Sequence, residues 1–190
     1  MKKLVIMVMG LLICLSVGAS AVMADLESEA TAHVYVNVVP NVAVRVMDAN
    51  VNLGQVQFGD FYSTITFQVE ANSQDVWLSA AASNLYKGNV PQSEYYLPVL
   101  EPAGVTITPD FATPMNGGSN NASFIGDYEI NGFPGLLTEQ INFESGQNNR
   151  FSQDVDLVFT WRQPDPDQPQ GQYSGWVKMY AMIYPLDTAQ

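Results

Sequence analysis

Apolar and polar residues alternate over a long stretch near the start of the chain. The apolar positions are Ala30, Ala32, Val34, Val36, Val38, Pro40, Val42, Val44 and Val46. A period of two residues predicts an extended chain with one face buried. Such a segment would span roughly 55 Å at about 3.3 Å per residue, whereas a compact domain of this size is only about 40 Å across. The segment must therefore either return into its own sheet or reach another molecule.

The same period recurs along the rest of the chain, and no 3.6-residue period accompanies it. Strands are predicted at Val42–Met47, Tyr62–Glu70, Val76–Ala82, Tyr95–Leu100, Val105–Thr108, Ala122–Ile130, Leu136–Phe143, Asp154–Arg162 and Tyr173–Tyr184. Many short strands predict an all-β, Ig-like antiparallel β-sandwich with an N-terminal extended strand. Frequent Gly, Asn and Pro predict long loops between residues 84 and 147. The segment QPDPDQPQGQ separates the last two predicted strands and indicates a hairpin loop at the surface.

The first 24 residues have the pattern of a signal peptide. Lys2 and Lys3 precede an apolar core, Leu4–Val17, and Val22-Met23-Ala24 forms a small-residue cleavage site. We therefore divide the chain into a signal peptide (1–24), an N-terminal extension with a candidate donor strand (25–41) and a β-sandwich domain (42–190). We expect secretion to the cell surface of a bacterium. No later apolar run has the length of a membrane span, so none is expected after cleavage.

Composition narrows the possible partners. Removal of the leader takes away Cys14, the only cysteine, so the exported domain must hold together through core packing and sheet hydrogen bonds. It also takes away two of the seven basic residues and none of the 19 acidic ones, which leaves five against 19, a net charge of −14. Nucleic acid and anionic membrane surfaces are poor partners for such a chain.

Residues that could carry catalysis do not assemble into a known motif. His33 is the only histidine, and it lies on the polar face of the first predicted strand. The chain has no G-x-S-x-G elbow and no glycine-rich phosphate loop. Asp154 and Asp156 share one face of a strand, which brings two carboxylates near each other, but a solvated surface explains them better. We expect no catalytic residue and no enzymatic activity.

A calcium site is the only metal centre that the acidic residues suggest. Asp165 and Asp167, together with Asp127 and Glu129, could supply oxygen ligands. The segment Asp165–Pro169 nevertheless lacks the third ligand and the glycine of a calcium-binding loop. We therefore predict no metal and no cofactor.

Aromatic residues suggest a second kind of function, in which they stack on sugar rings. The candidates are Trp77, Trp161, Trp176 and Tyr95-Tyr96. Trp161 shares a strand face with Val155, Leu157 and Phe159, which predicts a place in the core. Trp176 shares an aromatic face with Tyr180 and Tyr184, and these three residues are the predicted glycan contacts. The partner would be a polysaccharide of a host surface or of a matrix.

Two short motifs resemble those of pilin-like exported proteins. The segment Val51-Asn52-Leu53-Gly54-Gln55-Val56 is similar to a turn in these proteins, and Gly171–Tyr180 is similar to their final G-x-Y-x-x-x-V strand. The families are the spore coat protein U-like and fimbrial-subunit-like domains. The resemblance implies a secreted Ig-like sandwich that polymerises when the extended segment of one subunit completes the sheet of the next. Those families often contain a disulfide, which this chain cannot form.

The destination of the N-terminal strand decides between the alternatives. A strand that returns to its own sheet loses only the entropy of loop closure, whereas insertion into a neighbour also costs about 4–15 kcal/mol for association. The alternation, however, stays in phase across Pro40, and Pro40-Asn41 is a poor hairpin turn. We favour a structural subunit of a filament or surface layer, a homopolymer in which Ala30, Ala32, Val34, Val36 and Val38 are donated. A monomeric glycan-binding module is the alternative, and a hydrolase with a carboxylate pair is a third hypothesis.

Overall fold

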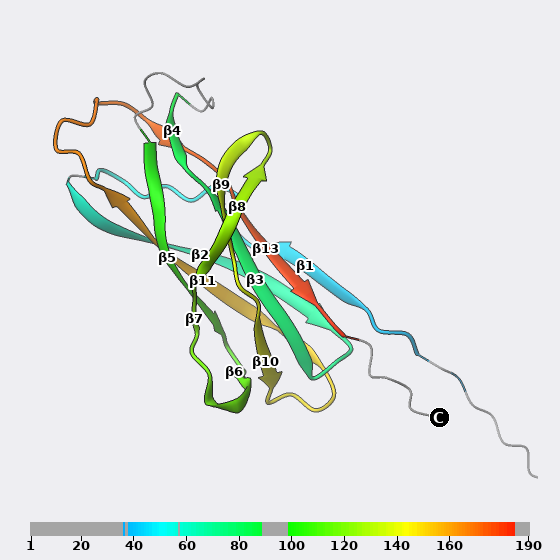
Figure 1. The fold of residues 1–190 in the computed structure, drawn as a ribbon. Helices are drawn as coiled ribbons and strands as arrows, with labels where there is room; N and C mark the ends of the chain where they lie inside the picture. The colour runs from blue at the N-terminus through cyan, green and yellow to red at the C-terminus, as the bar shows by residue number, and fades with distance from the viewer. Residues whose placement is uncertain (1–35, 37, 57, 89–98, 185–190) are drawn as a thin grey trace, which may run out of the picture. The chain divides into compact units, whose positions relative to one another are not determined.

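The computed structural model describes residues 36, 38–56, 58–88 and 99–184 of the chain. Contacts between residues divide the chain into two units, 1–37 and 38–190, and the fold described below belongs to the second. Its regular elements within the described residues are strands, apart from one 3-10 turn at Met115–Gly117. The strands form two antiparallel sheets that pack face to face (Figure 1), which confirms the predicted all-β antiparallel sandwich.

The first sheet has the strand order β1-β2-β11-β5-β4-β12, with β7 paired to β5. Its strands are β1 (Val42–Val46), β2 (Gly59–Ala71), β11 (Phe151–Gln163), β5 (Val99–Pro109), β4 (Leu85–Lys87), β12 (Tyr173–Ser174) and β7 (Asn121–Ala122). The pair β2 and β11 forms its centre, with 13 residues in register from Gly59 opposite Gln163 to Ala71 opposite Phe151. This long, unbroken ladder is the frame of the sheet.

The second sheet has the order β6-β10-β3-β9-β8, with β13 paired to the other side of β3. Its strands are β6 (Ala112–Pro114), β10 (Ile141–Ser145), β3 (Asp75–Ser83), β9 (Phe133–Thr138), β8 (Phe124–Ile130) and β13 (Val177–Met182). β3 is the central strand, and its side chains from Leu78 to Ser83 are all buried.

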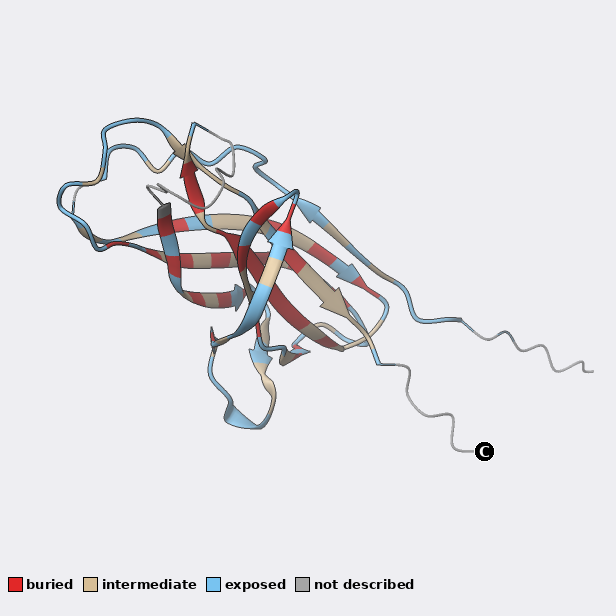
Figure 2. Cartoon of the chain, turned by 45° about the horizontal axis from the view of Figure 1, so that its top comes forward, coloured by how far each residue is buried: buried red, intermediate tan, exposed pale blue. Residues whose placement is uncertain are grey.

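The core lies between the two sheets and comes from the alternating positions of the strands (Figure 2). Along β11 the residues Val155, Leu157, Phe159 and Trp161 are buried, and the residues between them are less so. Trp161 is only 2% exposed, and its Nε1–H donates a hydrogen bond to Ser63 Oγ at 2.8 Å. The predicted core position of Trp161 is therefore confirmed.

The predicted hairpin between the last two long strands is wrong. β11 and β13 belong to different sheets, and the proline-rich loop connects β11 to the short strand β12, which pairs with β4 in the same first sheet. The predicted strand Tyr173–Tyr184 is accordingly two strands, because the chain changes sheets at Gly175. A Cβ atom at Gly175 would lie 2.5 Å from Ser83 Oγ and 2.6 Å from Asn84 O, so only glycine fits this close crossing.

The predicted strand Leu136–Phe143 is also two strands, β9 and β10, which border successive parts of β3 on the same side. At the break between them the Thr138 hydroxyl accepts a hydrogen bond from Ala80 N at 3.0 Å, in place of a backbone carbonyl. The predicted strand Ala122–Ile130 is likewise divided into β7 and β8, which join different sheets. The sequence pattern did not mark these breaks, because the partner strands decide where pairing stops.

Candidate subunit-contact site

Two edge strands lie next to each other on one side of the sandwich. Among the described strands, β1 pairs with β2 alone and β13 pairs with β3 alone. The two strands contact each other and lie side by side in Figures 1 and 2, but they share no backbone pairing among the described residues. We call this region the β1/β13 seam. It comprises the inward-facing residues Val42, Val44 and Val46 of β1 and Val177, Met179, Ala181 and Ile183 at and just after β13.

The seam covers the core incompletely. Only Met179 is fully buried, whereas Val42 and Val44 on β1 and Val177 and Ala181 on β13 are half-buried. Val46, at the end of β1, is 45% exposed. All seven seam residues are apolar, so the partially covered core here presents an uncharged surface.

At the seam, the backbone has N–H and C=O groups that no strand in the described part of the chain pairs. In an antiparallel pair, successive residues point their N–H and C=O groups alternately toward and away from the partner strand. Met47 N donates to Thr66 O at 3.0 Å, so the odd-numbered residues of β1 point their N–H and C=O groups toward β2. The backbone groups of the even-numbered residues Val42, Val44 and Val46 therefore point away from β2. Ser83 N donates to Trp176 O at 2.8 Å, and the same reasoning directs the backbone groups of Val177, Met179 and Ala181 away from β3. Both edges can therefore accept another strand.

Pro40 marks the point at which the pairing of β1 stops. Proline has no N–H to donate, and the side chain of Asn72 substitutes for the ladder on both sides of it. Its Oδ1 accepts from Asn41 N at 2.7 Å, and its Nδ2 donates to Val39 O at 2.8 Å. Sequence reasoning missed Asn72, because a period of two carries no information about a side chain that caps a strand end.

The predicted donor strand is described only in part. The side chains of Val36, Val38 and Val39 are 82%, 78% and 75% exposed. No strand precedes Val42 among the described residues. The other predicted donor residues, Ala30, Ala32 and Val34, lie outside the described residues. Two apolar positions of the alternating pattern are thus left open to solvent immediately before β1.

The predicted glycan contacts lie along the outer face of β13. Trp176 is 43% exposed and Tyr184 is 56% exposed, while Tyr180 is half-buried. They follow each other at intervals of four residues, or about 13 Å along a strand, so they do not converge on one point. Each ring also contacts another aromatic ring, in the pairs Trp176–Phe133, Tyr180–Tyr128 and Tyr184–Trp77. The three residues therefore connect β13 to β9, β8 and β3.

Charged groups near the seam lie on the outer faces of the sheets. Lys178 Nζ lies 5.0 Å from the centre of the Tyr180 ring, and its hydrogen bond to Tyr180 raises the pKa of Lys178. The hydrogen bond between the Tyr180 and Tyr128 hydroxyls raises the pKa of Tyr128. On the first sheet, Arg45 forms a 2.7 Å ion pair with Glu70. These groups do not enter the apolar seam.

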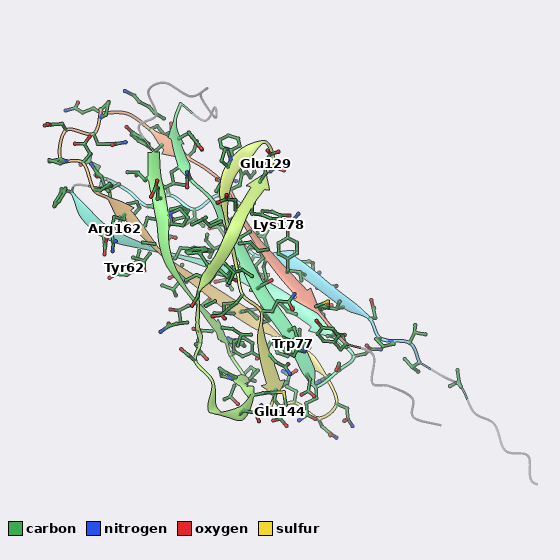
Figure 3. The ribbon with its side chains drawn as sticks, in the orientation of Figure 1. Tyr62, Trp77, Glu129, Glu144, Arg162 and Lys178 are labelled. Atoms are coloured by element: carbon green, nitrogen blue, oxygen red, sulfur yellow. The ribbon has the colours of Figure 1, made fainter. Side chains whose placement is uncertain are left out.

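Another ion pair joins the outer ends of β2 and β11. Arg162, which is labelled in Figure 3, contacts the Asp60 carboxylate through two hydrogen bonds of 2.8 and 3.2 Å. The hydrogen bond from Arg162 lowers the pKa of Asp60, although both side chains remain open to solvent. Exposed pairs of this kind contribute little to stability.

The carboxylates considered for catalysis and calcium have ordinary surroundings. Asp154 and Asp156 are half-buried on the outer face of β11, and Asp156 Oδ1 accepts a hydrogen bond from Thr66 Oγ1 at 2.6 Å. The possible calcium ligands Asp127 and Glu129 lie exposed on β8, and Asp165 and Asp167 lie exposed in the loop after β11. His33 lies outside the described residues. Within the described ranges, no group of three or more His, Cys, Asp or Glu side chains could hold a metal ion.

Comparisons with known proteins add no family to these observations. No protein-family model matches the chain, and no curated protein matches it. In the part of the chain that the structure describes, no helix has the length and apolar character needed to cross a membrane.

Proposed function

We propose that this protein is a non-enzymatic structural subunit of an extracellular, pilus-like filament or surface layer. Each subunit donates its N-terminal segment, with Ala30, Ala32, Val34, Val36 and Val38 as the apolar face, to the β1/β13 seam of a neighbouring copy. The observation that carries the proposal is the exposure of Val36 and Val38, at 82% and 78%, directly before a sandwich edge whose apolar side chains are half-covered.

The chemistry of the two surfaces supports this match. A strand added at the seam would hydrogen-bond to the outward N–H and C=O groups of β1 or β13, and its apolar side chains would complete the core. Each fully buried valine stabilises the contact by roughly 1.5–3 kcal/mol. Because every subunit both gives and receives a segment, the contact repeats head to tail and builds an open polymer.

Removal of the N-terminal segment tests the proposal. A variant that lacks residues 25–39 is expected to be folded and monomeric, whereas the parent protein forms high-mass species. The comparison uses size-exclusion chromatography with light scattering and negative-stain electron microscopy. Deletion of residues 25–29 alone is the control, because it shortens the chain but retains the alternating stretch. High-mass species from the variant without residues 25–39 would contradict strand donation.

Proline substitutions test the receiving edges. V44P and A181P each remove an N–H that points away from the partner strand, so the sandwich keeps its ladder hydrogen bonds while the seam loses a donor. We expect both variants to lower the high-mass fraction at nearly unchanged stability. The matched controls R45P and Y180P remove an N–H that points into the sheet and should lose about 1 kcal/mol or more of stability. Normal assembly of both V44P and A181P would argue against addition at the seam.

A further inference from the structure

The two strands of the β1/β13 seam run in opposite directions. β1 begins at Val42, opposite Ala71 at the end of β2. β13 ends at Met182, opposite Trp77 near the start of β3. Residues 72–74 alone connect β2 to β3, so these two points lie at the same end of the sandwich. In Figure 1 the β1 arrow points away from this end and the β13 arrow points toward it.

The N-terminal segment joins the sandwich at this end, which we call the exit end. Asn72 holds the chain there, because its Oδ1 accepts a hydrogen bond from Asn41 N at 2.7 Å and its Nδ2 donates to Val39 O at 2.8 Å. The backbone N–H of Asn72 also donates to Asn41 O at 3.2 Å. Only Pro40 separates Val39 from Asn41, so a copy that receives residues 32–38 must lie close to the exit end of the donor.

A donated segment can lie along the seam in two directions, and its direction decides the kind of assembly. If Val38 lies at the exit end of the receiving copy, the two exit ends face each other, and reciprocal donation closes a two-fold dimer. If Val38 lies at the far end of the seam, the exit end of each copy meets the far end of the next, and the series of copies stays open. A filament needs the second direction, in which the segment runs antiparallel to β13 and parallel to β1.

β13 is suited to an antiparallel partner. Antiparallel pairs are slightly more stable per residue than parallel ones, and directly opposite side chains point to the same face. The inward-facing side chains of β13 belong to odd-numbered residues, and Val177, Ala181 and the adjoining Ile183 are only half-buried. The apolar residues of the N-terminal segment are even-numbered. Each of them therefore lies opposite an odd-numbered residue of β13, and the possible registers differ in steps of two residues.

Pro40 limits the register. It belongs to the even-numbered, apolar face of the alternation, so its backbone would point toward β13, but it has no N–H to donate. Opposite Val177 it would leave the carbonyl of that residue without a donor. With Pro40 opposite Gly175 instead, it lies before the first residue of β13, and Val38 takes the place opposite Val177. One further step in the same direction would replace Val38 in the buried set by an alanine.

We propose, on the basis of the filament proposed above, that residues 32–38 of one copy pair antiparallel with β13 of the next copy. The inward-facing pairs are Val38–Val177, Val36–Met179, Val34–Ala181 and Ala32–Ile183. On the outer face, Asn37 lies opposite Lys178, which is labelled in Figure 3, and Tyr35 lies opposite Tyr180. The second of these is an aromatic cross-strand pair, a kind that stabilises a sheet. We call this arrangement the 38/177 register.

Disulfide trapping tests the 38/177 register, because Cys14 is the only cysteine of the chain and C14S removes it. The outward-facing residues form the non-hydrogen-bonded pairs of this ladder, whose Cα atoms lie about 4.5 Å apart, within the range of a disulfide. In the C14S background, N37C/K178C and Y35C/Y180C should each give a series of covalent oligomers on a non-reducing gel after mild oxidation. Reductant should abolish the series. None of these substitutions removes an inward-facing side chain, so each reduced variant should assemble as the C14S parent does.

Three shifted pairs are the matched controls. Y35C/K178C and N37C/Y180C report the registers one step away on either side. In the 38/177 register their Cα atoms would lie about 7–8 Å apart, too far for a disulfide. N37C/A43C reports the reversed direction, antiparallel to β1, and would give covalent dimers without longer oligomers. All three variants should stay free of cross-links.

The possible results separate the register from strand donation itself. Covalent oligomers from a shifted pair but not from N37C/K178C would overturn the register, while donation would stand. Dimers from N37C/A43C would overturn the direction and the open filament with it. Assembly that deletion of residues 25–39 abolishes, but that no cysteine pair on β13 traps, would move the segment away from β13. Absence of high-mass species in the C14S parent would remove the filament proposal and the 38/177 register together.

Discussion

Two aspartates on the apolar face of the N-terminal segment are expected to abolish self-assembly. In the variant V36D/V38D, both new carboxylates would be buried against the seam of the neighbouring subunit. An unpaired charge in an apolar contact costs several kcal/mol, more than the two valines contribute when buried. The high-mass species should therefore disappear. Because Val36 and Val38 are 82% and 78% exposed within their own chain, the fold of the subunit should be unaffected.

The matched control shifts the same two charges by one residue. Successive side chains of a strand point to opposite faces, so Y35D/N37D places its aspartates on the solvent side of a donated strand. This variant has two added negative charges, as V36D/V38D does, and should still assemble. Sedimentation velocity at equal protein concentration gives the comparison. Equal loss of assembly in both variants would mean that general charge repulsion, and not strand register, governs association.

Loss of the Trp161 side chain is expected to have the largest effect on stability. Trp161 is 2% exposed in the middle of the core, and its indole N–H is paired with the buried hydroxyl of Ser63 at 2.8 Å. W161A removes the ring and leaves a cavity between the sheets, so the free energy of unfolding should fall by about 3–5 kcal/mol. S63A leaves the indole N–H buried without its partner and should cost about 1–3 kcal/mol.

Urea unfolding followed by far-ultraviolet circular dichroism measures these differences. W176A is the control, because Trp176 is 43% exposed and contacts Phe133 at the surface, with ring centres 6.4 Å apart. It should change the free energy of unfolding by less than about 1 kcal/mol. A loss in W161A no larger than that in W176A would contradict the assignment of Trp161 to the core.

Only part of the candidate site could be predicted from the residue pattern of the sequence. The alternation from Ala30 to Val46 predicted an apolar face longer than one domain needs, and of the five predicted donor residues the structure describes Val36 and Val38, which are 82% and 78% exposed. The receiving edge was not predictable, because strand order depends on which strands meet across long sequence separations. Trp77 and Asn142 likewise become neighbours only when β3 and β10 pair, and Met115 joins them only through the pairing of β6 with β10.

The sequence by itself determined the class of the fold and the inward face of most strands. Period-two alternation is a local property, and it holds whichever strand lies alongside, so β2, β3 and β11 lie close to where the pattern placed them. Only the tertiary structure decided the partners. β11 and β13 have equally good strand patterns, with only the short strand β12 between them in the chain, yet they join different sheets because the backbone crosses from one sheet to the other at Gly175, after β12. Pairing is set by contacts between distant segments, and alternation along one segment does not encode them.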